Sequence, residues 1–146
     1  MPSSPSKPPA ARPVYRNINV LQILRYRLPV AAVVSILHRV SGALMFLLMP
    51  FVIWMFDASV TSEISHEAFT SAFVVGIGPF AGWFLKLVVL ALIWAYLHHF
   101  IAGIRHLWMD ATHAVTRQQG QLTAISTLLS SLALTALLGA KLFGLY

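Results

Sequence analysis

The sequence predicts an all-α membrane protein with three transmembrane helices. Of its 146 residues, 58% are hydrophobic and only 10% are charged, whereas about 25% are charged in a typical soluble protein. Its mean hydropathy is +0.78. Three continuous stretches, residues 40–56, 87–104 and 118–140, contain no Asp, Glu, Lys or Arg. Because these runs are continuous rather than alternating, they favour helices over a closed β-barrel.

The first predicted helix covers residues 29–56, which extends the uncharged run back across His38 and Arg39. Pro29 suits a first helical turn, whereas Pro50 lies inside the span and is expected to kink it. The second helix is expected at residues 80–109, after Pro79, and the third at residues 119–143. Each exceeds the roughly 20 residues that a membrane crossing requires.

Charged residues near the spans predict how the chain is oriented in the membrane. Residues 1–28 contain Lys and Arg but no acid, and their proline-rich start is typical of a flexible arm. The loop after the first span holds Asp57, Glu63 and Glu67 and no basic residue. The excess of Lys and Arg on the cytoplasmic side of membrane proteins therefore predicts a cytoplasmic N-terminal arm, residues 1–28, before a membrane domain, residues 29–146. The C-terminus is then periplasmic.

The charge and the absence of cysteine exclude several functions. A net charge of +6 suggests nucleic-acid binding in a soluble protein, but here the basic residues flank apolar spans, so we expect a lipid bilayer and no nucleic acid as partner. With no Cys, this chain cannot form disulfides, thiolate metal sites, iron–sulfur ligation or a covalent haem attachment.

A cluster of polar residues interrupts the first span. The run Ser35-Ile36-Leu37-His38-Arg39-Val40-Ser41-Gly42 holds four polar side chains in eight residues. Spacings of four and three place Ser35, Arg39 and Gly42 on one helical face, with His38 beside it. Since ionisable groups inside a span cost about 2.5–3.5 kcal/mol each, they are candidates for function. We interpret this face as the wall of a pocket rich in hydrogen-bond donors, with a glycine that admits a neighbour.

The second span carries a second polar cluster. At 100° per residue, one face within about 60° of arc holds the following four residues: His99, Gly103, His106 and Asp110. His98 and Arg105 form another row about 100° away. A histidine one turn from a glycine notch, with arginine nearby for carboxylates, suits a b-type haem, whose iron takes a neutral imidazole nitrogen. Both clusters are expected in the cytoplasmic half of the membrane.

Three other interpretations remain open at this point. A single buried Ser or His in a membrane helix more often forms an interhelical hydrogen bond than a cofactor site, and that is our reading of Ser41 or His98 taken alone. His38, His99 and Asp110 are also compatible with a proton relay in a small transporter or channel without haem. A purely structural anchor is a further alternative.

The two clusters together resemble a known family. The residues that carry the resemblance are, in order, Arg12-Pro13, Ser35-Ile-Leu-His38-Arg39-Val-Ser41-Gly42 and His99-x-x-x-Gly103-Ile-Arg105-His106-x-x-x-Asp110. This set resembles the cytochrome b subunit of succinate dehydrogenase, the larger membrane anchor of bacterial respiratory complex II. The resemblance covers roughly residues 12–110 and the number of spans. Two motifs in the same order make it specific.

The resemblance implies a cofactor, a substrate and partners. His99 would be an axial ligand of one haem b shared with a second membrane-anchor subunit, so this chain would be half of a two-subunit haem-binding bundle. Ser35 and Arg39 would line the ubiquinone site. Three residues would contact haem propionates or surround the ligand: His38, Arg105 and His106.

The resemblance also implies where the chain works. An iron–sulfur subunit and a flavoprotein would complete a succinate:ubiquinone oxidoreductase in the bacterial inner membrane, where this multi-pass chain supplies no catalytic residue alone. An anchor of a quinol:fumarate reductase is the nearest alternative, because the sequence does not fix the direction of the reaction.

Overall fold

The computed structural model of the chain describes residues 19–113 and 116–146. Six helices and one short hairpin make up this part of the chain. In order they are α1 (Val20–Arg25), α2 (Val30–Leu47), α3 (Met49–Val60), α4 (Glu63–Ala72), β1 (Gly76–Ile77), β2 (Phe80–Ala81), α5 (Gly82–Thr112) and α6 (Arg117–Leu142).

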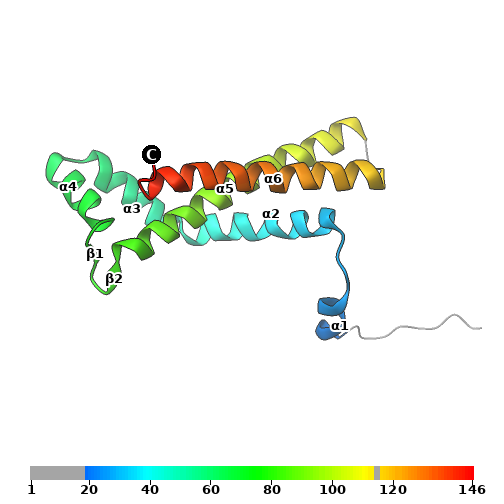
Figure 1. Cartoon of the computed structure of the whole chain (residues 1–146), viewed down its shortest axis with the longest axis horizontal. Coiled ribbons are helices and arrows are strands. Elements are labelled where there is room, and N and C mark those ends of the chain that lie inside the picture. Colours follow the sequence, from blue (N-terminus) through cyan, green and yellow to red (C-terminus); the bar gives the residue numbers. More distant parts are fainter. Residues whose placement is uncertain (1–18, 114–115) are drawn as a thin grey trace, which may run out of the picture.

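Three long helices, α2, α5 and α6, lie side by side and form the body of the molecule (Figure 1). Each is long and apolar enough to cross a membrane, which confirms the predicted class of an all-α protein with three spans. At about 1.5 Å per residue, the 31 residues of α5 extend about 46 Å. Helix α5 therefore forms the longest element against which the other two spans pack.

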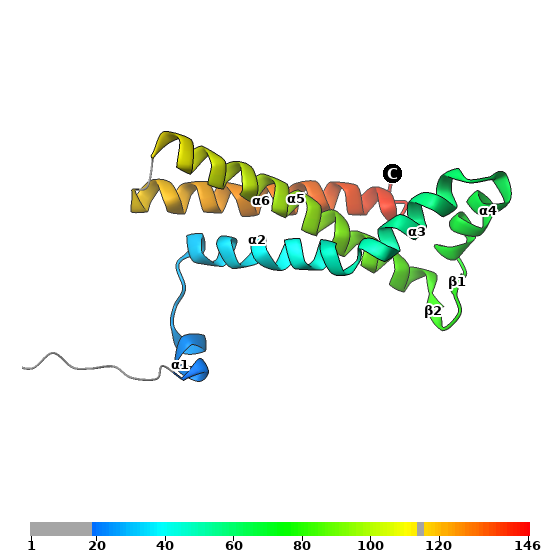
Figure 2. The same cartoon turned by 180° about the vertical axis from the view of Figure 1, so that it is seen from behind.

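The first predicted helix is broken rather than merely kinked. Helix α2 ends at Leu47, Leu48 leaves helical geometry, and α3 begins at Met49 with Pro50 in its first turn. Proline has no N–H to donate, and its ring clashes with the carbonyl four residues earlier, so it is tolerated at a helix start but not in a helix interior. Helix α3 consequently leaves the axis of α2 and runs toward α4 (Figures 1 and 2).

The end of the bundle that carries α4 and the hairpin is closed by tight backbone contacts. Gly76 has a positive φ of 112°, and a Cβ there would lie 2.2 Å from the Phe80 carbonyl oxygen. A Cβ at Gly82 would lie 2.5 Å from the Phe73 carbonyl oxygen. Only glycine allows both approaches, so the hairpin is held against the start of α5.

The burial pattern is the reverse of that in a soluble protein. Ser41, His98 and Ser131 are fully buried, whereas large apolar side chains such as Phe46, at 77% exposure, face outward. Small residues let the helices approach closely, since Ala102 and Ala124 are fully buried and a Cβ at Gly139 would lie 2.8 Å from Leu90 Cδ1. Polar groups inside and apolar groups outside fit a protein whose surroundings are lipid.

Candidate functional site

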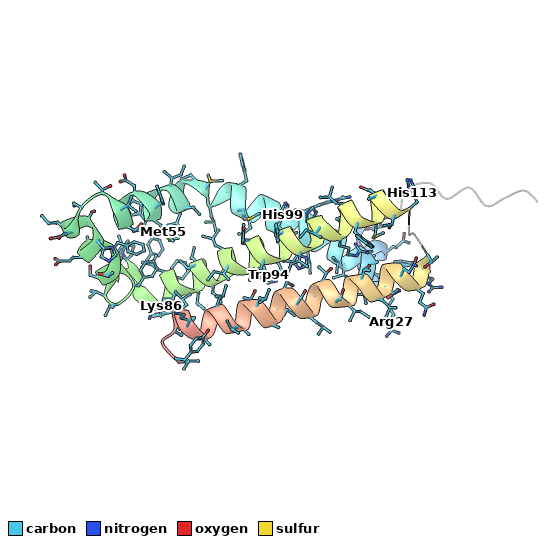
Figure 3. The ribbon with its side chains drawn as sticks, turned by 90° about the horizontal axis from the view of Figure 1, so that it is seen from above. Arg27, Met55, Lys86, Trp94, His99 and His113 are labelled. Carbon is cyan, nitrogen blue, oxygen red and sulfur yellow. The ribbon has the colours of Figure 1, made fainter. Side chains whose placement is uncertain are left out.

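His99 is held by α2 through one of its two ring nitrogens. It lies where α2 and α5 run side by side (Figure 3). Its Nδ1 is 3.0 Å from the His38 carbonyl oxygen and 3.3 Å from Ser41 Oγ. A carbonyl oxygen only accepts, so in the neutral ring Nδ1 carries the proton and donates it. The second nitrogen, Nε2, then carries a lone pair that accepts no hydrogen bond from residues 19–113 or 116–146.

Ser41 supports the same contact from α2. Its Oγ donates to the His38 carbonyl oxygen at 2.8 Å, so its lone pairs face the His99 Nδ1–H. The side chain is fully buried. The His38 carbonyl and the Ser41 hydroxyl together fix both the tautomer and the orientation of the His99 ring.

Gly42 provides the space that the His99 ring occupies. A Cβ at Gly42 would lie 3.0 Å from His99 Cε1 and 3.3 Å from its Nδ1. This agrees with the interpretation of Gly42 as a glycine that admits a neighbour. A Cβ at Gly103 would meet only His38 Nε2, at 3.7 Å, an ordinary contact. The glycine that touches the His99 ring is therefore Gly42, and the space beside Gly103 faces His38.

Three half-buried histidines gather between α2 and α5, and we call them the histidine cluster: His38, His99 and His106. The His38 and His99 rings stack with centroids 4.1 Å apart and planes 16° apart. His106 lies 5.2 Å from His38 at 52°. Within residues 19–113 and 116–146, no group of three or more His, Asp or Glu side chains is arranged to hold a metal ion. The cluster therefore brings three imidazoles together without the described residues forming a metal-binding group of their own.

Ser35 and Arg39 lie one turn apart on α2, next to the histidine cluster in the sequence. Ser35 is half-buried, whereas Arg39 is exposed. Arg39 is the tenth residue of α2, which puts it about 15 Å into the helix. An exposed guanidinium at that depth is costly against lipid, so this surface of α2 requires another polar or protein neighbour.

Arg105 is not brought together with the histidine cluster. Its Nε donates to Thr123 Oγ1 at 3.0 Å and its Nη2 to the Gly120 carbonyl oxygen at 3.1 Å. Both acceptors belong to α6, and the side chain is only 7% exposed. These bonds hold the guanidinium on the α6-facing side of α5, so of the three residues expected around the haem propionates, His38 and His106 are placed near His99 and Arg105 is not.

His98, next to His99 in the sequence, has a different role. It is fully buried, its Nδ1 lies 3.2 Å from Ser131 Oγ on α6, and its ring stacks on Trp94 at 5.4 Å. This contact agrees with the reading of His98 as an interhelical hydrogen-bonding residue. Sequence reasoning gave Ser41 the same role, and its contact with His99 does join α2 to α5. What the sequence did not indicate is that the partner of Ser41 would be His99.

Three apolar spans with a histidine cluster between the first two are consistent with a membrane-anchor subunit. The sequence model of the succinate dehydrogenase/fumarate reductase transmembrane subunit family matches residues 11–138. The chain is a member of that family.

Named relatives agree with this assignment. The chain is 31% identical to the succinate dehydrogenase cytochrome b556 subunit of Coxiella burnetii over 85% of this chain and 94% of that protein. It is 29% identical to the protein of the same name from Paracoccus denitrificans over 77% of this chain and 81% of that protein.

Proposed function

We propose that this chain is the cytochrome b membrane-anchor subunit of a succinate:ubiquinone oxidoreductase. It would bind one haem b together with a second anchor subunit and form part of the quinone-reduction site. The observation that carries this proposal is the geometry of His99, whose Nδ1 donates to the His38 carbonyl and whose Nε2 keeps a free lone pair. That is the arrangement by which proteins prepare a neutral imidazole for a metal.

The residues around His99 fit a haem. Gly42 leaves room for the imidazole, and the space beside Gly103 is free of protein atoms nearer than His38 Nε2. His38 and His106, which lie near His99, would donate to the propionates, whereas Arg105 would reach them only by leaving its bonds to α6. Haem b, when bound, supplies a one-electron carrier close to the quinone. Because this chain offers one well-placed axial imidazole, the second ligand would come from the partner anchor.

Ser35 and Arg39 are proposed to bind the quinone. A quinone oxygen becomes more negative as it accepts an electron, and a hydroxyl and a guanidinium held at fixed positions stabilise that charge best in a dry pocket. The exposure of Arg39 at membrane depth fits a surface that a quinone and a second subunit would cover. Succinate oxidation itself would occur on the flavoprotein, with electrons arriving through the iron–sulfur subunit.

The same proposal includes the orientation in a bacterial inner membrane. Residues 1–28 would be the cytoplasmic arm and residues 29–146 the membrane domain. Arg25, Arg27 and Arg117 lie at one end of the bundle, and the acids of α3 and α4 lie at the other. A C-terminal alkaline phosphatase fusion should therefore be active, whereas an inactive phosphatase with an active cytoplasmic reporter at Tyr146 would contradict the topology.

The haem assignment is tested by a spectrum of the purified complex. The wild-type complex should show a b-type reduced-minus-oxidised spectrum, and His99→Leu should abolish it because the iron loses its ligand from this chain. His66→Leu, at an exposed histidine on α4, is the matched control and should keep the spectrum. An unchanged spectrum in His99→Leu with all subunits present would refute the proposal.

The family also includes fumarate reductase anchors, which gives a second candidate function. In that case the same residues would oxidise a quinol, and electrons would flow toward fumarate. Comparing the rates of succinate oxidation and fumarate reduction by the purified complex separates the two functions.

A further inference from the structure

A cavity at the α1 end of the bundle belongs neither to the histidine cluster nor to the proposed quinone site. Its volume is about 710 Å³, and it lies between the segment before α2, the end of α5 and the start of α6. Arg27, near this end in Figure 3, lines it together with Arg105 and Arg117. We call it the basic cavity. None of the described residues that line it is an acid.

Arg105 gives the basic cavity a buried positive charge. The side chain is 7% exposed, and the two hydrogen bonds described above go to a hydroxyl and a carbonyl, which are both uncharged. A buried charge is costly unless an opposite charge accompanies it. Three of the four acids of the chain lie in α3 and α4 at the other end, and the fourth, Asp110, is exposed and does not line the cavity. The compensating anion therefore has to come from outside this chain.

The start of α6 adds to the positive potential. Arg117 is the first residue of α6, and no acid lies in that helix's first turn. A helix N-terminus carries a partial positive charge, and the exposed Arg117 adds a full charge beside it, although the Thr116 hydroxyl already accepts from the Gln119 N–H. Two independent features, a buried guanidinium and a helix start next to an arginine, thus favour an anion in one place.

The remaining lining of the basic cavity is apolar. Leu28, Val30 and Met109 lie beside the three arginines. The cavity also lies where α2 and α6 begin and α5 ends. Because all three helices are long enough to span a bilayer, we expect their ends, and the cavity between them, near the lipid headgroups. Charged groups beside apolar ones at this depth match an amphiphile, whose phosphate would meet the guanidiniums while its acyl chain lies against the aliphatic side chains.

We propose that the basic cavity binds the phosphate of an anionic membrane phospholipid. Arg105 is a fixed donor on α5, and Arg27 and Arg117 close around the phosphate from the segment before α2 and from α6. The bound lipid would supply the charge that Arg105 lacks and would hold the ends of all three spans together. This site does not depend on whether His99 binds haem.

The test uses the purified complex in nanodiscs of phosphatidylcholine with added phosphatidylglycerol. Phosphatidylglycerol should raise the melting temperature of the complex, because a ligand that binds only the folded state stabilises it. Arg27→Gln and Arg117→Gln should each weaken the affinity for phosphatidylglycerol about five-fold, since each removes one charge from the cavity, so the same rise in melting temperature should need about five times more phosphatidylglycerol. Arg25→Gln, at an exposed arginine at the same end that does not line the cavity, is the matched control and should respond like the wild type.

Three results would overturn the proposal. The first is an equal response to phosphatidylglycerol in the cavity variants and in Arg25→Gln. The second is an equal rise in melting temperature with inorganic phosphate alone, which would assign the cavity to a small free anion. The third is that the complex carrying Arg117→Gln loses another subunit while the lipid content of the complex stays unchanged. That result would mean that a carboxylate of a partner subunit supplies the charge.

Discussion

The two sides of α5 treat neighbouring histidines in opposite ways. On the α2-facing side, His99 is half-buried and donates its Nδ1 proton to a backbone carbonyl, which leaves Nε2 free. On the α6-facing side, His98 is fully buried, and its Nε2 has no hydrogen-bond partner within the described part of the chain. A rotation of 100° along one helix thus separates an imidazole that is held by α2 from one that is held by α6.

The comparison teaches that the neighbouring helix, not the residue type, decides the role of a histidine. Helix α2 offers His99 a glycine and a carbonyl, so the ring is oriented and partly open. Helix α6 offers His98 a serine within a closed interior. Substitutions on the two sides should therefore differ in kind: those on the α2 side change cofactor and quinone chemistry, and those on the α6 side change stability.

The largest effect is expected from Gly42→Val. The new side chain would occupy the space of the His99 ring, because even a Cβ would lie 3.0 Å from His99 Cε1. Haem content per assembled complex should fall by about ten-fold or more. Gly120→Ala is the control, since a Cβ there meets no atom within 4 Å. If Gly42→Val does not assemble, the smaller change Gly42→Ala should still shift the reduced spectrum. A wild-type spectrum in every variant that does assemble would contradict the proposed site.

Arg39→Leu should have the next largest effect. Removing the guanidinium should lower succinate:quinone activity about 100-fold, the range found when a stabilising donor is lost. Ser35→Ala should act in the same direction. Succinate oxidation with an artificial dye should be unaffected, because it does not need the quinone site. Equal losses of both activities would mean that assembly had failed and that these residues do not bind quinone.

Ser131→Ala tests the α6-facing side. It would leave His98 Nδ1 without its hydrogen-bond partner in a closed interior. The free energy of unfolding should fall by about 1 kcal/mol, while the haem spectrum stays unchanged. Ser126→Ala is the matched control, because that exposed serine bonds only to its own helix at Thr123. A lost spectrum in Ser131→Ala would mean that the two sides of α5 are not independent.

The smallest effect is expected from Ser41→Ala. The His38 carbonyl would still hold His99 Nδ1 at 3.0 Å, so only the longer of its two contacts disappears. Haem affinity should fall by less than about ten-fold, as measured by haem transfer to an apoprotein acceptor. Ser41→Thr retains a hydroxyl and should restore part of the affinity. A complete loss of haem in Ser41→Ala would place the main support of His99 on the serine instead of the carbonyl.

Several features could be predicted from the sequence because they depend on local properties. The three spans follow from long uncharged runs, and the disruption near Pro50 follows from proline chemistry. The clustering of His38 with His99 was expected from their similar depth in antiparallel spans. The position of Arg105 was not predictable, because its spacing on α5 allowed contacts with either neighbouring helix.

By itself, the sequence determined that this is a three-span membrane protein and which polar residues lie at the same depth, since hydrophobic length and helical spacing are properties of each segment alone. Only the tertiary structure decided which carbonyl meets His99 and that Arg105 turns to α6. Those outcomes depend on how α2, α5 and α6 are rotated about their axes. The close contacts at Gly42 and Gly139 accompany these rotations, because the His99 ring and the Leu90 side chain occupy the space that a Cβ at either position would need.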